Sequence, residues 1–112
     1  MEASQLVRRY NIGQRQFDRA DLREAQLPGV FLGEACLNYA DLTWANLSQA
    51  NLERSQLAGA MIWRTCLGWA NLKRVDLRRA LVLRSSFTFG DLTEASLQQA
   101  DLRLSDFRQA NL

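Results

Sequence analysis

The chain has 112 residues, a formal net charge of +2 from 14 Lys and Arg against 12 Asp and Glu, and no histidine. Without histidine there is no Ser-His-Asp or Cys-His catalytic pair, no histidine-containing metal site and no ordinary near-neutral general base. The two cysteines are too few for a disulfide framework or a four-cysteine zinc site.

The length fits a single domain. The first residues lack the basic and then apolar pattern of a signal peptide, and no apolar stretch approaches the ~20 residues that span a bilayer. We therefore expect a cytoplasmic protein with no membrane segment.

Residues 1–16 are predicted to contain a short helix. Ser4 is the predicted N-cap, the side chains of Leu6, Val7 and Tyr10 share one helical face, and Gly13 is placed to end the helix. This apolar face indicates that the helix packs against the chain that follows it.

Residues 17–112 repeat with a period of five. Every fifth residue from Phe17 to Leu112 is apolar, twenty times without interruption. The residue two places earlier is small: of the 19 residues in this column from 20 to 110, 12 are alanine and the others are Val, Ser, Thr or Gly. Between the two columns, ten repeats carry Asp or Asn, so the unit is A-[DN]-L-x-x.

A period of five fits neither a helix, which needs 3.6, nor a continuous strand, which needs two. A short extended piece followed by a corner does fit. The small residue and the Leu then point inward, while the Asp or Asn points outward and bonds to nearby backbone.

This unit, unbroken over residues 17–112, resembles the repeat of the pentapeptide repeat proteins, and residues 6–17 resemble the helical lead-in of cyanobacterial members. The resemblance implies an all-β fold, a right-handed quadrilateral β-helix with four pentapeptides in each coil. It further implies about five coils over residues 17–112, with residues 1–16 as an N-terminal capping segment that covers the first coil.

A wrap of twenty residues can be compared with one of fifteen. At twenty, outward apolar residues meet one another: Met61 meets Leu81, Trp63 meets Leu83 and Trp69 meets Phe89. At fifteen, the same three residues would meet Asp76, Arg78 and Arg84, which favours the square coil.

The twenty-residue wrap makes further contacts testable. It predicts a stack of Phe87 on Phe107, and we interpret Gly90 as the volume compensation for the Phe87 ring. It also places four charged residues in one column, with opposite charges at both ends: Glu34, Arg54, Arg74 and Glu94.

Catalysis is not expected. The carboxylates recur at the Asp/Asn position as part of the scaffold, and a shaft filled with leucines has no interior pocket that would shift a pKa. We predict no cofactor and no metal. Cys36 and Cys66 fall on opposite faces, too far apart for a disulfide, and are interpreted as tolerated thiols with a redox role as the alternative.

Outward apolar residues gather on one face of the predicted shaft, with Trp69 and Phe89 around the corner. We call this set the apolar patch; it comprises Trp44, Met61, Trp63, Leu81, Leu83 and Leu104. Contiguous apolar surface with tryptophan is typical of a protein-binding surface. The alternative is that these side chains only stack into ladders that stiffen the shaft.

The predicted last coil lacks a plug, and Phe107 and Leu112 form its candidate association edge. Three alternatives remain open for this edge: a homodimer about a twofold axis, continuation into another repeat chain, or truncation.

The sequence thus predicts a rigid, non-enzymatic scaffold for protein–protein interaction, with the partner and the physiological role left open. The resemblance also suggests a DNA mimic that modulates a topoisomerase, but the net charge of +2 disfavours it. Nucleic-acid binding is not expected, because the basic residues of the middle repeats spread over three faces: Arg54, Arg64, Lys73, Arg74, Arg78, Arg79 and Arg84.

Overall fold

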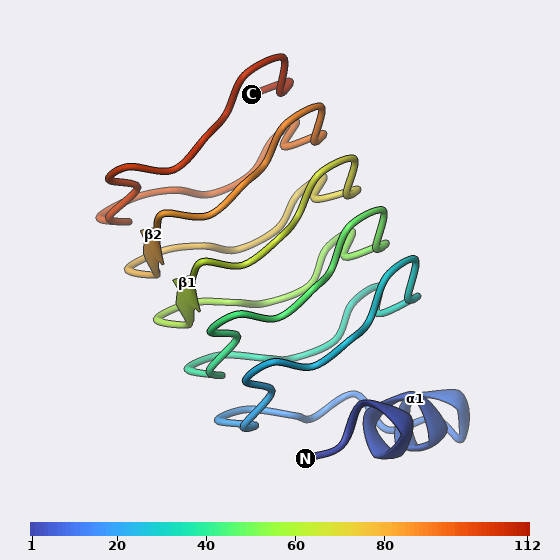
Figure 1. Cartoon of the computed structure of the whole chain (residues 1–112). Helices are drawn as coiled ribbons and strands as arrows, with labels where there is room; N and C mark the ends of the chain where they lie inside the picture. Colours follow the sequence, from blue (N-terminus) through green and yellow to red (C-terminus); the bar gives the residue numbers. More distant parts are fainter.

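The computed structural model describes residues 1–112 as a stack of coils, with a single helix at one end and the C-terminus at the other (Figure 1). Its extents are 34 × 22 × 19 Å. Helix α1 spans Ala3–Asn11, strand β1 spans Met61–Trp63 and strand β2 spans Leu81–Leu83. None of the helical structure combines the length and apolarity needed to cross a bilayer.

Successive coils are joined by parallel β-bridges between residues twenty apart, from Gln16 with Cys36 to Asp91 with Asn111. Backbone hydrogen bonds run between coils in both directions, for example from the Phe17 N–H to the Cys36 oxygen at 2.8 Å and from the Asp41 N–H to the Ala20 oxygen at 3.0 Å. One turn of the chain therefore takes four pentapeptides, which confirms the predicted wrap of twenty residues over one of fifteen.

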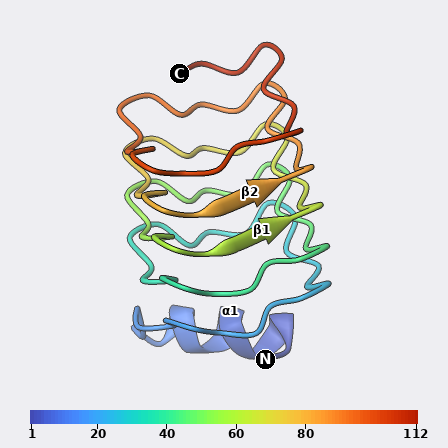
Figure 2. The ribbon, with the colours of Figure 1, turned by 90° about the vertical axis from the view of Figure 1, so that its left-hand side faces the viewer.

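Strands β1 and β2 lie side by side on one face (Figure 2). Their register pairs Met61 with Leu81, Ile62 with Val82 and Trp63 with Leu83, as the sequence predicted. Ile62 and Val82 are the β-branched members of the every-fifth-residue column, and β-branched residues favour extended backbone.

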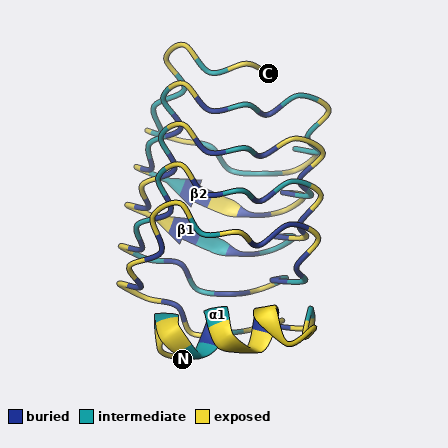
Figure 3. Ribbon diagram, turned by 90° about the vertical axis from the view of Figure 1, so that its right-hand side faces the viewer, coloured by how far each residue is buried: buried dark blue, intermediate teal, exposed yellow.

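The core is the column of every fifth residue together with the small residues two places before each of them. Every member of the large column from Phe17 to Leu92 is buried, and all of them belong to one cluster. Farther along, Leu97, Leu102 and Phe107 are half-buried and Leu112 is 71% exposed (Figure 3). The Phe87 and Phe107 rings stack with centroids 4.7 Å apart and planes 8° apart, as predicted.

The corners of the coil use left-handed backbone. The residue two places after each member of the large column, from Arg19 to Gln109, has a φ between 52° and 67°. Only Gly29 and Gly59 among these corner residues are glycine. In most repeats a hydrogen bond closes the corner, as from the Ala20 N–H to the Phe17 oxygen at 3.1 Å.

The Asp/Asn column supports these corners from outside. In nine repeats the side-chain Oδ1 accepts a hydrogen bond from the backbone N–H two residues on, as from Arg78 to Asp76 at 3.1 Å. This is the backbone-supporting role that the sequence predicted for these residues.

Helix α1 lies against the first coil. Leu6 and Tyr10 are buried in the same cluster as the coil leucines, and the Tyr10 hydroxyl donates a hydrogen bond to the Gly33 oxygen at 2.6 Å. The prediction of Ser4 as N-cap is wrong: the cap is Glu2, whose N–H donates to Gln5 Oε1 at 3.2 Å, so the helix begins two residues earlier. Gly13, with φ of 107°, follows the end of the helix as predicted.

One other expectation is corrected. A Cβ at Gly90 would meet the Phe87 backbone oxygen at 3.0 Å, and its three nearest neighbours include no ring atom, so Gly90 does not make room for the Phe87 ring.

The twenty-residue wrap stacks the four charged residues in one column, as predicted. Within this column Arg74 Nε lies 2.7 Å from Glu94 Oε2, and Glu34 and Arg54 at the other end form no ion pair.

Candidate protein-binding face

The apolar patch lies on the face that carries β1 and β2. Within it, Trp44 is 56% exposed, Trp63 43% and Leu104 73%, and Leu81 is also exposed. Met61 and Leu83 are half-buried. The structure thus gathers all six residues on one face, on consecutive coils, with two of them partly covered by their neighbours.

A ladder of three hydroxyls lies behind this face, with Thr65 and Ser85 buried and Ser105 half-buried. The Thr65, Ser85 and Ser105 hydroxyls donate to backbone oxygens of the preceding coil, at Leu42, Ile62 and Val82, each at 2.8 Å. The Thr65 N–H donates to Ser85 Oγ at 3.0 Å and the Ser85 N–H to Ser105 Oγ at 3.1 Å.

Because the Thr65 and Ser85 N–H groups donate to these hydroxyls, they do not make the ordinary corner bonds to the Ile62 and Val82 oxygens. Strands β1 and β2 form at these two positions. The sequence pattern predicts only that these three residues are small. Their signal was the run of hydroxyl residues at a spacing of twenty, and their effect is to fix the strands that present the patch.

Three arginines border the patch. The Arg64 guanidinium lies over the Trp44 ring, 5.2 Å from the centroid, while Arg84 and Arg103 line an apolar hollow with Trp63, Leu83 and Leu104. Arg103 is held by Asp101, at 2.8 Å from Nε to Oδ1 and 2.7 Å from Nη2 to Oδ2. From the sequence alone, Arg64 and Arg84 belong to the basic residues spread over three faces, and nothing distinguishes Arg103.

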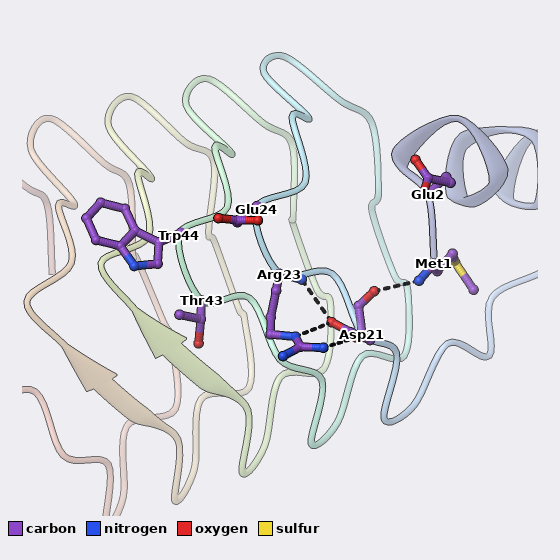
Figure 4. Close-up of a pocket in the computed structure, with 7 residues that line it drawn as sticks. All are labelled: Met1, Glu2, Asp21, Arg23, Glu24, Thr43 and Trp44. Carbon is purple, nitrogen blue, oxygen red and sulfur yellow. Dashed lines mark hydrogen bonds and ion pairs between the residues drawn. The ribbon is translucent and has the colours of Figure 1, made fainter.

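A polar hollow of about 530 Å³ lies between this face and the N-terminus (Figure 4). It is lined by Met1, Glu2, Asp21, Arg23, Glu24, Thr43 and Trp44. Arg23 folds back onto Asp21, with Nη2 at 2.6 Å from Oδ2. The Met1 amino group donates a hydrogen bond to the backbone oxygen of Asp21 at 2.8 Å. Trp44 thus stands at the rim of the hollow as well as in the apolar patch.

Several outward carboxylates are neutralised by an arginine two residues on: Asp21 by Arg23, Asp76 by Arg78, Asp101 by Arg103 and Asp106 by Arg108. The hydrogen bond from each arginine side chain holds the pKa of its carboxyl below the usual range. The pKa of Asp91 is also lowered, chiefly by the hydrogen bond from the Thr93 side chain. These carboxylates stay ionised and bonded to the scaffold.

The other candidates are placed as follows. Cys36 is half-buried, Cys66 is exposed and both are free thiols. The Trp69 and Phe89 rings stack with centroids 4.4 Å apart, as predicted, one corner beyond the patch along the chain. No three His, Cys, Asp or Glu side chains gather into a metal-binding group. Phe107 and Leu112, the candidate association edge, lie in the last coil.

Comparison with protein families matches residues 16–54, 35–74 and 70–112 to pentapeptide repeats, in eight copies. The chain belongs to the pentapeptide repeat family. It is similar in structure to a pentapeptide repeat protein from the cyanobacterium Cyanothece 51142, with 22% identity, a TM-score of 0.73 and coverage of 97% of this chain and 90% of the other. This likeness supports the fold, which in this family is a right-handed quadrilateral β-helix.

Two further structures from Nostoc PCC 7120 show higher identity and lower TM-scores. HetL, involved in heterocyst differentiation regulation, is 30% identical with a TM-score of 0.39; the match covers 91% of this chain and 47% of HetL, so the chain spans about half its length. Another pentapeptide repeat protein is 32% identical with a TM-score of 0.38, covering 97% of this chain and 74% of that protein. A comparison with curated proteins gives no match.

Proposed function

We propose that this protein is a non-enzymatic scaffold, a β-helix of about five coils closed at one end by α1, that binds another protein through the apolar patch. The observation that carries the proposal is the exposure of Trp44, Trp63 and Leu104 on the one face built on β1 and β2. Exposed apolar surface centred on tryptophan is typical of interaction sites rather than of inert surface.

The rigidity of this face supports the proposal. Its two strands are bonded to the coils on either side, and the Thr65, Ser85 and Ser105 hydroxyls bond them from behind. A surface that is already ordered loses little conformational entropy on binding, so more of the contact energy appears as affinity.

The test is affinity capture from the native cells, with the double variant Trp63→Ala and Leu83→Asp. We expect a protein that binds the wild type to be lost from this variant and kept by the control Trp69→Ala, which alters a tryptophan on another part of the surface. Melting curves establish that all the variants are folded. Equal capture by the wild type and the double variant would show that the patch only stiffens the shaft.

A second proposed surface is the edge formed by Phe107 and Leu112, where we infer pairing with another copy of the chain. The support is the partial exposure of Phe107 and the 71% exposure of Leu112. Sedimentation equilibrium of the wild type and of Leu112→Asp tests this pairing, which predicts a dimer that the variant dissociates. A monomeric wild type at high concentration would contradict it.

The surface gives no support to a DNA mimic. Four of the outward carboxylates that would imitate phosphates are held by Arg23, Arg78, Arg103 and Arg108, whereas duplex DNA presents a dense line of negative charge. The proposal places the scaffold in the cytoplasm, where the free thiols of Cys36 and Cys66 are kept reduced.

A further inference from the structure

The surface next to the apolar patch carries positive charge that the protein itself does not neutralise. Arg64 and Arg84 occupy the same corner on consecutive coils, both exposed, and neither has a carboxylate within ion-pair distance. We infer that the patch receives a segment of a partner protein in which an apolar side chain is flanked by carboxylates. This inference rests on the proposed function and specifies the chemistry of the partner.

The geometry provides a place for the apolar side chain. Trp63, Leu83 and Leu104 line a hollow of about 510 Å³, and Arg84 and Arg103 form its basic rim. The volume has room for a large apolar side chain together with the backbone that carries it. Burying such a side chain against Trp63 and the leucines removes apolar surface from water and supplies the binding energy.

The charges select what flanks that side chain. Arg103 is already bonded through Nε and Nη2 to Asp101, and Asp41 accepts hydrogen bonds from the Thr43 N–H and hydroxyl at 3.0 and 2.6 Å. Arg64 lies over the Trp44 ring, which holds its side chain along the edge of the patch. The free positive charge is therefore that of Arg64 and Arg84, and it favours carboxylates beside the apolar anchor.

The segment binds through side chains and not as an added strand. The backbone of β1 and β2 is bonded on both sides, since the Met61 N–H donates to Ala40, the Leu81 N–H to Ala60 and the Val82 N–H to Asp101. No strand edge is free on this face for a further strand to pair with.

The experiment is fluorescence anisotropy with the full chain and three labelled peptides, EDLFED, KKLFKK and EDSSED. We expect EDLFED to bind, and both the charge-reversed KKLFKK and the anchor-free EDSSED to bind at least about tenfold more weakly. Raising the salt from 0.05 to 0.5 M should weaken the binding of EDLFED several-fold, because the added ions screen the arginines.

Matched variants locate the site. Arg84→Glu should weaken EDLFED at least about tenfold and strengthen KKLFKK, whereas Arg79→Glu changes the same charge at an equivalent corner of another face and should leave both unchanged. Trp63→Ala should abolish EDLFED binding, while Trp69→Ala should not. Circular dichroism melts establish that the four variants remain folded.

The outcomes separate this inference from the proposed function. If KKLFKK binds as tightly as EDLFED and both depend on Trp63, the selection for carboxylates is wrong while the binding face stands. If Arg84→Glu and Arg79→Glu weaken the binding of EDLFED equally, the inferred preference for carboxylates is likewise wrong. Binding to phosphatidylserine vesicles that depends on Trp63, with no binding of EDLFED, would replace the protein segment by a membrane surface and overturn the inference.

Discussion

At the scale of single residues, two identical side chains in the small column differ in their hydrogen bonds. Ser55 and Ser85 both occupy the small column and both are buried. The Ser55 corner closes with the usual bond from its N–H to the Leu52 oxygen, and its hydroxyl has no partner. The Ser85 hydroxyl accepts from the Thr65 N–H and donates to the Ile62 oxygen.

This contrast predicts opposite effects of one substitution. Ser85→Ala should lower the free energy of unfolding by about 1–3 kcal/mol, because it leaves the Thr65 N–H and the Ile62 oxygen without that partner. Ser55→Ala should leave the stability unchanged or raise it by up to about 1 kcal/mol, because it removes an unsatisfied buried hydroxyl. Urea denaturation measures both. Equal destabilisation by the two substitutions would contradict the role of the hydroxyl ladder.

The sequence predicted the inward columns because burial requires apolar residues, and such residues at every fifth position are easy to detect. It did not predict the left-handed corners, because 17 of the 19 corner residues are not glycine. Left-handed backbone costs a non-glycine residue on the order of 1 kcal/mol, so an isolated turn would favour glycine there. Here the bonds between coils impose the corner conformation, and a local sequence pattern cannot show this.

At the scale of elements, helix α1 is held by one apolar face and one buried hydrogen bond. Leu6 is fully buried, and the Tyr10 hydroxyl reaches across 23 residues of chain to the Gly33 oxygen. The predicted face of Leu6, Val7 and Tyr10 was sufficient to locate the helix, but the N-cap was misplaced because Ser4 is a stronger cap on preference alone than Glu2.

Tyr10→Phe tests the attachment of α1 to the first coil. We expect the free energy of unfolding to fall by about 1 kcal/mol, because the Gly33 oxygen loses a buried donor while the ring still packs. Tyr39→Phe is the control, since Tyr39 is 54% exposed and its hydroxyl makes no hydrogen bond within the protein. Denaturation curves compare the two; a loss of stability as large in Tyr39→Phe would contradict the attachment.

For the candidate site, the sequence predicted which apolar residues are neighbours but not which arginines lack an ion-pair partner. The period of five and the wrap of twenty were enough to bring Trp63 and Leu83 together, because equal spacing forces equal direction. The surplus charge of Arg64 and Arg84 was not predictable, since it depends on which carboxylates are already bonded. Asp101 is bonded to Arg103, so no carboxylate is left for Arg84, and this pairing depends on the three-dimensional arrangement of the side chains.

At the scale of the whole molecule, the Asp–Arg pairs make the free energy of unfolding depend on pH in the acidic range. The folded-state pKa of Asp76, Asp101 and Asp106 lies below the value of about 3.9 for an unfolded chain. Their contribution is therefore fully present above that value and is lost as the pH falls through the lower folded pKa values. Because the pairs are exposed, each contribution is modest.

Melting temperatures should accordingly be constant from pH 7 to about 5 and should fall below about pH 4. Asp76→Asn keeps an Oδ1 acceptor for the Arg78 N–H and removes the titrating group, so its melting temperature should fall less between pH 5 and pH 3 than that of the wild type. A melting temperature that rises on acidification would contradict this account of the pairs.

The wrap of twenty residues brings together the apolar patch, the two arginines and the hydroxyl ladder. Disulfide formation tests this wrap directly. Cys36 and Gln56 are paired in a parallel β-bridge between successive coils, and residues paired in this way lie close enough for a disulfide. In a Cys66→Ser background, Gln56→Cys should oxidise to a disulfide within one chain, with the loss of both thiols, and Asn51→Cys, fifteen residues from Cys36, should keep its thiol. A disulfide in the Asn51→Cys protein, with free thiols in the Gln56→Cys protein, would contradict the wrap.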